Sequence, residues 1–449
     1  MKSKKLVLFA IPALAIAALT GCKKKYDVSI IVYNWADYIY DGTDDDGNIV
    51  EEGVVELFEN YYKEKYGKKL YVDYRTFSTP EEMYNQIKTG SISPDLICPS
   101  DYMIQKMANE GMLEKFSYDE ASSAYGDSLK NFGDYGSPFI KNRFKNVKLN
   151  DGNSFLTYAL PYFWGTMGFT YDDSYFAAED VASWECLWTN GEITEEHPKG
   201  KNYGQFSLKN SMRDTYVTAI FHVYHDEIVA LDENDPEYNA KLTAIFNRCD
   251  DATIAKVETA LIQALKTTVS ALEVDEGKDE IVKATCAYHA NLAWSGDAIY
   301  AMDSADDAET KTLCYSLPKE GSNVWFDGWC MPKGANKEIA EEFVNFISSP
   351  EIAAMNMDYV GYTSPIVGED VWKLVNEKYA AKAGEESYSV DLSFYFGTEA
   401  KINVPTSEQG RQFDAQYPTE DVLKKCCMMN DFGSQQKKVE DMWVRVQAA

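Results

Sequence analysis

The apolar residues of the chain follow two different periods, and each period predicts one kind of element. The mainly apolar stretches 28–34 and 95–99 are typical of buried strands, and we also expect strands at 70–74 and 205–209. In the intervening stretches apolar residues recur every three or four positions, as they do along one face of a helix. Strands and helices that alternate at this spacing indicate parallel sheets flanked by helices. The sequence therefore predicts an α/β protein.

The same reading extends along the rest of the chain. The apolar stretch 155–169 is long enough to be an extended segment that passes from one lobe to another. We expect the tail to be irregular until its last helix, and we find no internal repeat and no disordered linker. Further strands are expected at 284–294, 312–318 and 324–332, and helices at 54–66, 254–272, 338–347 and 437–446.

Two helix starts carry a side-chain cap. Thr79 is the expected cap of a helix with Pro80 in its first turn and Glu82 closing a capping box. Ser211 and Asp214 have the same spacing and predict a second capped helix. This second start follows the strand 205–209, and ligands in open α/β sheets gather at the carboxyl ends of strands. Asp214 can therefore cap a helix and also face a ligand.

The first residues are typical of a targeting segment. Three lysines within the first five residues precede an apolar run from Leu6 to Thr20, which is too short to span a bilayer as a stable helix. The run ends in Leu-Thr-Gly-Cys, and small residues before Cys22 resemble the lipobox of bacterial lipoproteins. We expect residues 1–22 to be a lipoprotein signal peptide and Cys22 to carry the lipid. The mature chain is then soluble, outside the cytoplasm and tethered to a membrane by its N-terminus.

Composition narrows the class of partner. The 449 residues have a net charge of −29 at pH 7, which argues against nucleic acid because a phosphate backbone would be repelled. The same charge favours the approach of a cationic ligand. Apolar residues make up 45% of the chain, enough for the cores of two or three lobes.

No pattern in the chain predicts a metal or a cofactor. The eight cysteines after Cys22 are scattered without zinc-type spacing, and we expect most of them to be free, buried thiols. His222 and His225 share a helix but have no third ligand in view. The acidic stretch 41–48 places no glycine and glutamate in the register of a calcium loop, so we interpret it as a surface loop.

Three short pieces of the chain pair an indole with an acid. They are Asn-Trp-Ala-Asp-Tyr at 34–38, Trp-Ser-Gly-Asp at 294–297 and Val-Trp-Phe-Asp at 324–327. An aromatic face attracts a cation by about 0.5–2 kcal/mol. A carboxylate neutralises the cation, and burying an ammonium without one costs several kcal/mol. If the three pieces converge, they predict a pocket for a small organic cation; taken singly, each pair is also compatible with the edge of a core.

Together with Pro-Ser-Asp-Tyr at 99–102, Pro-Tyr-Phe-Trp-Gly at 161–165 and Gly-Tyr-Thr-Ser-Pro at 361–365, these pieces resemble the spermidine/putrescine-binding proteins of bacterial polyamine importers. The resemblance covers nearly the whole mature chain in order. It implies the two-lobed periplasmic-binding-protein fold of type II, with mixed sheets flanked by helices and a hinge between the lobes. The lobes expected from it are 27–164 with 324–372, and 165–323 with 373–449.

The resemblance also implies which residues contact the ligand. Aromatic walls are implied at Trp35, Tyr38, Tyr102, Trp294, Trp325 and Tyr362, and acids at Asp37, Asp214, Asp297 and Asp327. Asp327 matches the family's ammonium-binding acid, and Asp297 matches an acid of the putrescine-selective branch. Ser211 stands where spermidine binders have aspartate, and Met429 where they have glutamine. The loss of an acid disfavours the longer polyamine, so we expect putrescine to be preferred over spermidine.

The expected function is thus capture of a polyamine in the cleft and its delivery to an ABC permease by a monomer that is no enzyme and uses no cofactor. Three other readings stay open at this point. One is a receptor for a sugar or an amino acid, because aromatic clefts also suit sugars. Another is a carboxylate-dependent hydrolase, because acids abound, although the chain has only four histidines and no G-x-S-x-G motif. The third is a surface adhesin that has kept the fold and lost transport.

Overall fold

The computed structural model describes residues 26–43, 47–274 and 276–449. The expected signal peptide and Cys22 lie outside these ranges, as does part of the acidic stretch 41–48. The strands are β1 (Val28–Trp35), β2 (Leu70–Phe77), β3 (Leu96–Ile97), β4 (Leu113–Glu114), β5 (Tyr118–Asp119), β6 (Ala124–Tyr125), β7 (Ala159–Asp172), β8 (Phe206–Lys209), β9 (Val269–Glu273), β10 (Ala290–Trp294), β11 (Leu313–Ser316), β12 (Ser322–Pro332), β13 (Ser387–Asp391), β14 (Lys401–Pro405) and β15 (Cys426–Cys427).

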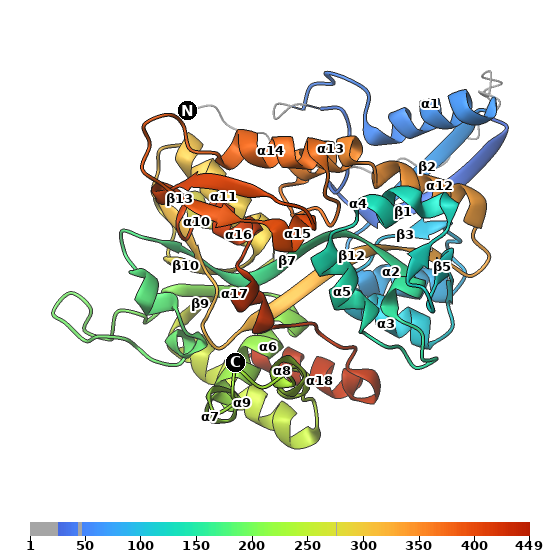
Figure 1. Ribbon diagram of the computed structural model, residues 1–449. Helices are drawn as coiled ribbons and strands as arrows, with labels where there is room; N and C mark the ends of the chain where they lie inside the picture. The colour runs from blue at the N-terminus through green and yellow to red at the C-terminus, as the bar shows by residue number, and fades with distance from the viewer. Residues whose placement is uncertain (1–25, 44–46, 275) are drawn as a thin grey trace, which may run out of the picture.

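The helices surround these strands on both sides (Figure 1). The α-helices are α1 (Val54–Tyr66), α2 (Pro80–Lys88), α3 (Asp101–Asn109), α4 (Lys130–Tyr135), α5 (Pro138–Lys145), α6 (Met212–Val223), α7 (His225–Val229), α8 (Tyr238–Phe246), α9 (Asp251–Lys266), α10 (Glu276–Val282), α11 (Ser295–Asp307), α12 (Lys337–Ile347), α13 (Pro350–Val360), α14 (Glu369–Tyr379), α15 (Ser393–Phe396), α16 (Gln412–Gln416), α17 (Glu420–Lys424) and α18 (Gln436–Gln447). Short 3-10 turns are η1 (Asp127–Leu129), η2 (Phe155–Thr157), η3 (Ala178–Val181), η4 (Trp184–Leu187), η5 (Thr406–Glu408) and η6 (Gly433–Gln435).

Two parallel sets of strands are joined by two long antiparallel strands. The order along the sheet is β2-β1-β3-β12-β7-β10-β8-β9. β1 is parallel to β2 and β3, and β8 is parallel to β9 and β10. At the centre, β12 is antiparallel to both β3 and β7, and β7 is antiparallel to β10. The expected parallel sheets are therefore present as two halves, and β7 and β12 cross between them (Figure 1).

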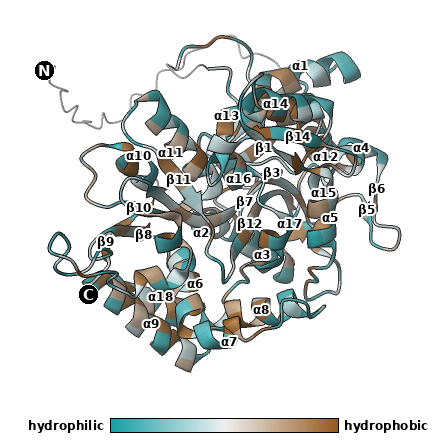
Figure 2. Ribbon diagram, turned by 60° about the vertical axis from the view of Figure 1, so that its left-hand side comes forward, coloured by the Kyte–Doolittle hydropathy of each residue, from teal (hydrophilic) through white to brown (hydrophobic). Residues whose placement is uncertain are grey.

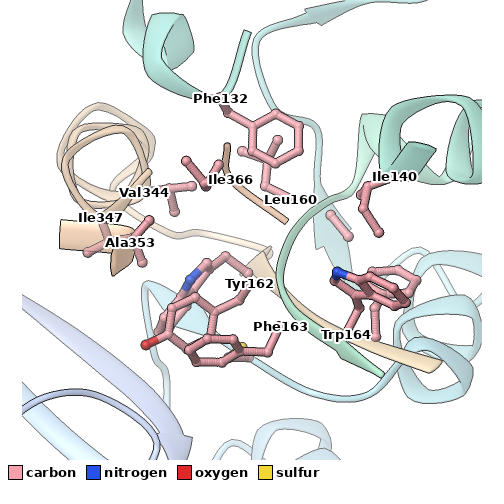
Figure 3. Packing of buried hydrophobic residues seen from close by; sticks show 14 of the residues in the cluster. Phe132, Ile140, Leu160, Tyr162, Phe163, Trp164, Val344, Ile347, Ala353 and Ile366 are labelled. Atoms are coloured by element: carbon pink, nitrogen blue, oxygen red, sulfur yellow. The ribbon is translucent and has the colours of Figure 1, made fainter. Parts of the chain in front are cut away.

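The buried apolar residues form two large clusters, and β7 belongs to both. Every residue of β7 is buried; Phe163 and Trp164 pack in the first cluster, and Met167 and Phe169 pack in the second. In Figure 3, Tyr162 lies on the side of Val344, Ile347 and Ala353, whereas Trp164 lies on the side of Ile140 of α5. The prediction that 155–169 passes between lobes is confirmed in its main part. The apolar core of each lobe is thus continuous with the strand that links them.

Both helix starts carry the predicted hydroxyl cap, but the side chain of Glu82 accepts a hydrogen bond from Gln86 Nε2 at 3.0 Å and does not close the expected capping box. The hydroxyl of Thr79 accepts a hydrogen bond from the backbone N–H of Glu82 at 3.1 Å, and the hydroxyl of Ser211 accepts one from Asp214 at 3.4 Å. Peripheral helices turn their apolar face inward: Figure 2 shows α9 with brown and teal residues on different faces, and its buried positions include Ile254, Val257 and Leu261. These helices therefore follow the 3.6-residue period.

Three sequence predictions of secondary structure are wrong. The helix expected at 254–272 ends at Lys266, and Leu272 lies in strand β9. The strand expected at 284–294 is only β10 (Ala290–Trp294). The region between 366 and 425, expected to be irregular, contains helix α14 and the hairpin β13–β14. Its buried residues, from Val371 to Tyr417 and beyond, pack in the first cluster. The residue boundaries of the lobes stay a prediction.

Several chemical expectations concern the whole molecule. Among the described residues no cysteine is in a disulfide; Cys98, Cys186, Cys330, Cys426 and Cys427 are buried and the other three are half-buried. No group of three or more His, Cys, Asp or Glu in the described ranges has the arrangement of a metal site. No helix in the described part of the chain has the length and apolar character needed to cross a bilayer.

Candidate ligand-binding site

The first part of the site is the loop after β1. β1 ends at Trp35, whose indole contacts Phe77 of the neighbouring strand with ring centroids 4.8 Å apart. Asp37 has a positive φ of 51°, which turns the chain sharply and directs Tyr38 back into the molecule. Tyr38 is buried against Tyr162 and Phe163. The side chain of Asp37 is exposed, so of the acids named from the sequence it is the one at the surface.

Asp327 is the centre of the site. It lies in β12, at the point where the pairing of β12 with β7 shifts register, and only 6% of it is exposed. The hydroxyl of Tyr38 donates a hydrogen bond to Asp327 Oδ2 at 2.7 Å. Burial raises the pKa of Asp327 to about 6, and the hydroxyl groups of Ser100 and Tyr38 oppose that rise. Oδ1 of Asp327 has no hydrogen-bond partner within the described residues.

A second buried carboxyl lies close enough to Asp327 to influence it. Asp101 begins helix α3, directly after the β-bridge between Ser100 and Asp327. Its Oδ1 accepts a hydrogen bond from the N–H of Tyr102, and its Oδ2 has no partner in the part of the chain that the structure describes. Burial raises the pKa of Asp101 far above its usual value, and the charge of Asp327 adds to the rise. The two carboxyls therefore favour sharing a proton or a cation rather than carrying two negative charges.

Aromatic rings lead from Tyr38, the hydrogen-bond partner of Asp327, toward the other half of the molecule. Tyr362 packs edge-on against Tyr38 at 6.0 Å and against Trp325 at 5.2 Å between ring centroids. The hydroxyl of Tyr362 donates to Asp297 Oδ1 at 2.8 Å. Asp297 lies in the first turn of α11, so this bond joins the loop after α13 to the second half of the molecule. The close approach needs Gly296, because a Cβ there would lie 2.4 Å from the Tyr362 ring.

Asp297 is paired with a lysine of the same chain. Lys209, the last residue of β8, donates a hydrogen bond to Asp297 Oδ2 at 2.9 Å and places its ammonium 3.8 Å from the ring centroid of Trp294. Burial alone would raise the pKa of Asp297, but the charges of Lys209 and Lys278 lower it. On the edge of the same indole, Trp294 Nε1 donates to Asp214 Oδ1 at 3.2 Å. Burial raises the pKa of Asp214.

Tyr102 is covered by an arginine from the opposite half of the sheet. The guanidinium of Arg213 lies 3.7 Å from the ring centroid of Tyr102 and 4.4 Å from that of Phe432. Arg213 also donates to the carbonyl of Asn430 at 2.7 Å. The Tyr102 hydroxyl donates to Glu81 at 3.1 Å. Tyr102 belongs to the first apolar cluster and Phe432 to the second, so this stack connects the two.

Contacts thus link most of the residues that the sequence singled out. A continuous series of contacts runs through Asp327, Tyr38, Tyr362, Trp325, Asp297, Lys209, Trp294 and Asp214. Trp35 and Tyr102 have other direct neighbours, Phe77 and Arg213. Asp101, Lys209 and Arg213 were not predicted from the sequence as part of the site. Each lies beside a residue or motif that had been noted, but its burial and its partner depend on distant segments.

The fold and the site define a class. Two α/β halves, joined by crossing strands and meeting at a wall of aromatic rings and carboxylates, form the two-lobed fold of periplasmic binding proteins. Among solved structures, the chain is similar to the spermidine/putrescine ABC transporter substrate-binding protein PotD from Streptococcus pneumoniae, with a TM-score of 0.60 and 22% identity over 94% of this chain and 98% of that one. It is also similar to the TpPotD lipoprotein of Treponema pallidum, with a TM-score of 0.59 and 16% identity over 93% and 99%.

Comparison of the amino-acid sequence with known families and proteins identifies the family of this chain. Residues 56–370 match the model of the bacterial extracellular solute-binding proteins, and the chain belongs to that family. Its relatives include the spermidine/putrescine-binding periplasmic protein of Escherichia coli, 24% identical over 80% of this chain and 83% of the relative. Another is the putrescine-binding periplasmic protein PotF of the same species, 24% identical over 82% and 86%. The family consists of binding proteins, not enzymes.

Proposed function

We propose that this chain captures an aliphatic polyamine between its lobes, prefers putrescine to spermidine, and delivers the ligand to the permease of an ABC transporter. The observation that carries the proposal is the Asp327 carboxyl. It is buried, it holds one oxygen without a partner among the described residues, and it accepts a hydrogen bond from Tyr38, whose ring packs against Tyr362. The names of the relatives given above support the same class of ligand.

A diamine suits this arrangement because it has two ammonium heads on an apolar spacer. One ammonium head would pair with the Asp327 carboxylate. It would donate hydrogen bonds to Asp327 Oδ1 and Asp101 Oδ2, the two oxygens that have no partner among the described residues. The aromatic rings would cover the methylene groups and attract the charges. Closure of the lobes would remove water and strengthen both interactions. No bond is made or broken.

The remaining parts of the proposal concern the setting in which the protein acts. Residues 1–22 resemble a lipoprotein signal peptide, and we propose that a lipid on Cys22 holds the mature monomer outside the cytoplasm at a membrane. The lysines at 23–25 would keep the tether close to anionic headgroups. The lobes would comprise 27–164 with 324–372, and 165–323 with 373–449.

Isothermal titration calorimetry tests the site. Asp327→Asn keeps the shape of the side chain but removes the charge, and we expect a loss of about 2–5 kcal/mol of putrescine binding, roughly 30-fold or more in Kd. The matched control is Asp421→Asn on helix α17, where 89% of the side chain is exposed and wild-type affinity should remain. Wild-type affinity in Asp327→Asn would refute the site.

A thermal-shift panel tests the class of ligand. Putrescine and spermidine should raise the unfolding temperature, whereas sugars and neutral amino acids should not. A shift with a sugar or an amino acid and none with any polyamine would replace the proposal with a receptor for that ligand.

A further inference from the structure

The site contains a deeply buried ammonium group of the chain's own, that of Lys209. The side chain of Lys209 is only 1% exposed and that of Asp297 5%. The Lys209 ammonium donates to Asp297 Oδ2 at 2.9 Å and to the carbonyl of Val274 at 3.3 Å, and it lies 3.8 Å from the centroid of the Trp294 ring. The sequence predicts that an aromatic face and a carboxylate contact an ammonium group of the ligand. At Trp294 and Asp297, the ammonium group of Lys209 occupies that position instead.

The negative charge of Asp297 is already neutralised by cations of the chain. Besides Lys209, the carboxylate receives the Tyr362 hydroxyl at 2.8 Å, and the Lys278 ammonium lies 3.7 Å from Oδ1. These groups overcome the effect of burial and lower the pKa of Asp297. A further ammonium at this carboxylate would be the third cation around one negative charge, and like charges at such distances repel. The Asp297 subsite is therefore unfavourable for a head of the ligand.

Asp327 and Asp214 differ from Asp297 in this respect. Neither makes an ion pair within 4.0 Å with a lysine or arginine of the described residues, and burial raises the pKa of both, although the charges of Lys209 and Arg213 oppose the rise at Asp214. Asp101 is buried beside Asp327, so the two share one positive charge more readily than they take two. The site then offers two places that need a cation, at Asp327 and at Asp214.

A ligand would not displace Lys209, because its ammonium is buried and leaving it or Asp297 without the other would strand a buried charge. We propose that Lys209 is a specificity-determining residue, a tethered cation that replaces one ammonium of the ligand at Trp294 and Asp297. The site then selects diamines over triamines. This inference rests on the proposed function, and it gives the preference for putrescine a structural cause.

The test removes the tethered cation and keeps an unbranched side chain that is one atom shorter. Calorimetry with putrescine and spermidine is run on the wild type and on Lys209→Met. The variant makes the Trp294 face and the Asp297 carboxylate available to the third ammonium of spermidine. The affinity for spermidine relative to putrescine should therefore rise by about tenfold or more, which corresponds to one cation–π contact together with its ion pair. Lys209→Arg keeps a cation, and its selectivity should stay within about threefold of the wild type.

A second variant guards against a merely structural effect. Lys209→Met with Asp297→Asn removes both buried charges together, so neither member of this pair is left without the other. It should keep putrescine affinity within about threefold and lose the spermidine gain, because the uncovered carboxylate is gone. Far-UV circular dichroism and the unfolding temperature establish that each variant is folded, and the double variant decides the matter if Lys209→Met alone does not fold.

The outcomes separate the two proposals. A wild type that binds neither amine refutes the proposed function. A wild type that binds putrescine, together with a Lys209→Met variant of unchanged selectivity, overturns the role of Lys209 and leaves the function standing. Loss of putrescine binding in the folded double variant, to the extent seen in Asp327→Asn, also overturns it, because Asp297 would then contact the ligand.

Discussion

The hydroxyl of Tyr38 should set the pH range in which the protein binds its ligand. That hydroxyl donates to Asp327 at 2.7 Å and opposes the rise in pKa that burial causes, so that the pKa of Asp327 lies at about 6. A ligand ammonium favours the ionised carboxylate. Below pH 6, binding must therefore displace a proton, and the affinity should fall by about tenfold for each pH unit.

Tyr38→Phe keeps the ring and removes only the donor. A hydrogen bond to a charged group contributes about 1.5–3 kcal/mol, which corresponds to about one to two pKa units. The pKa of Asp327 should move upward by that amount. Since the raised pKa favours the protonated carboxyl, putrescine affinity should weaken by about two- to tenfold at pH 7 and recover at higher pH.

Calorimetry across pH 5–9, in pairs of buffers with different ionisation enthalpies, gives both the affinity and the number of protons released. The wild type should release about half a proton from Asp327 at pH 6, and burial of Asp101 and Asp214 can only add to this number. Tyr61→Phe is the matched control, because Tyr61 donates to Glu342 at 2.6 Å on helix α1, in another part of the molecule. Affinity that is flat with pH in the wild type, or a midpoint that Tyr38→Phe leaves in place, would refute the reasoning.

Two further predictions concern the contacts between the halves. Gly296→Ala places a Cβ 2.4 Å from the Tyr362 ring, so we expect destabilisation of about 1–3 kcal/mol in chemical unfolding. Gly133→Ala, where the nearest atom is at an ordinary 3.5 Å, should be neutral or stabilising, and equal effects of the two would contradict this packing. Arg213→Met removes the stack on Tyr102, and small-angle X-ray scattering should show a larger radius of gyration without ligand; an unchanged radius would argue that the stack does not hold the halves together.

The parts of the fold that the sequence predicted are those governed by local patterns. β1, β2 and β12 contain short runs of apolar residues, and helices α1, α12 and α18 begin within one residue of the predicted positions, whereas α9 begins three residues before Ile254. Helix α14 was missed although Val371, Val375 and Tyr379 lie on one buried face at intervals of four. The hairpin β13–β14 alternates between exposed and half-buried or buried residues, and such a weak pattern depends on tertiary packing.

The site was predictable only as a set of residue types. Trp-Ser-Gly-Asp at 294–297 and Val-Trp-Phe-Asp at 324–327 have the same chemistry in sequence, and the structure brings both to the region where the halves meet. Lys209 carried no signal, because a lysine at the end of a strand is usually solvated. Its partner lies 88 positions away, and no local pattern encodes such a pair.

The contrast between Asp327 and Asp297 follows from that distant lysine. Both carboxyls are buried beside an aromatic wall, and burial alone would raise the pKa of each. It does so for Asp327, whereas the Lys209 and Lys278 ammonium groups reverse the direction for Asp297. A carboxylate that lacks a cation gains most from a charged ligand, and one that already has two gains least. The number of ammonium heads that the site accepts is therefore set by the charges the chain itself places there, rather than by the number of acids that line it.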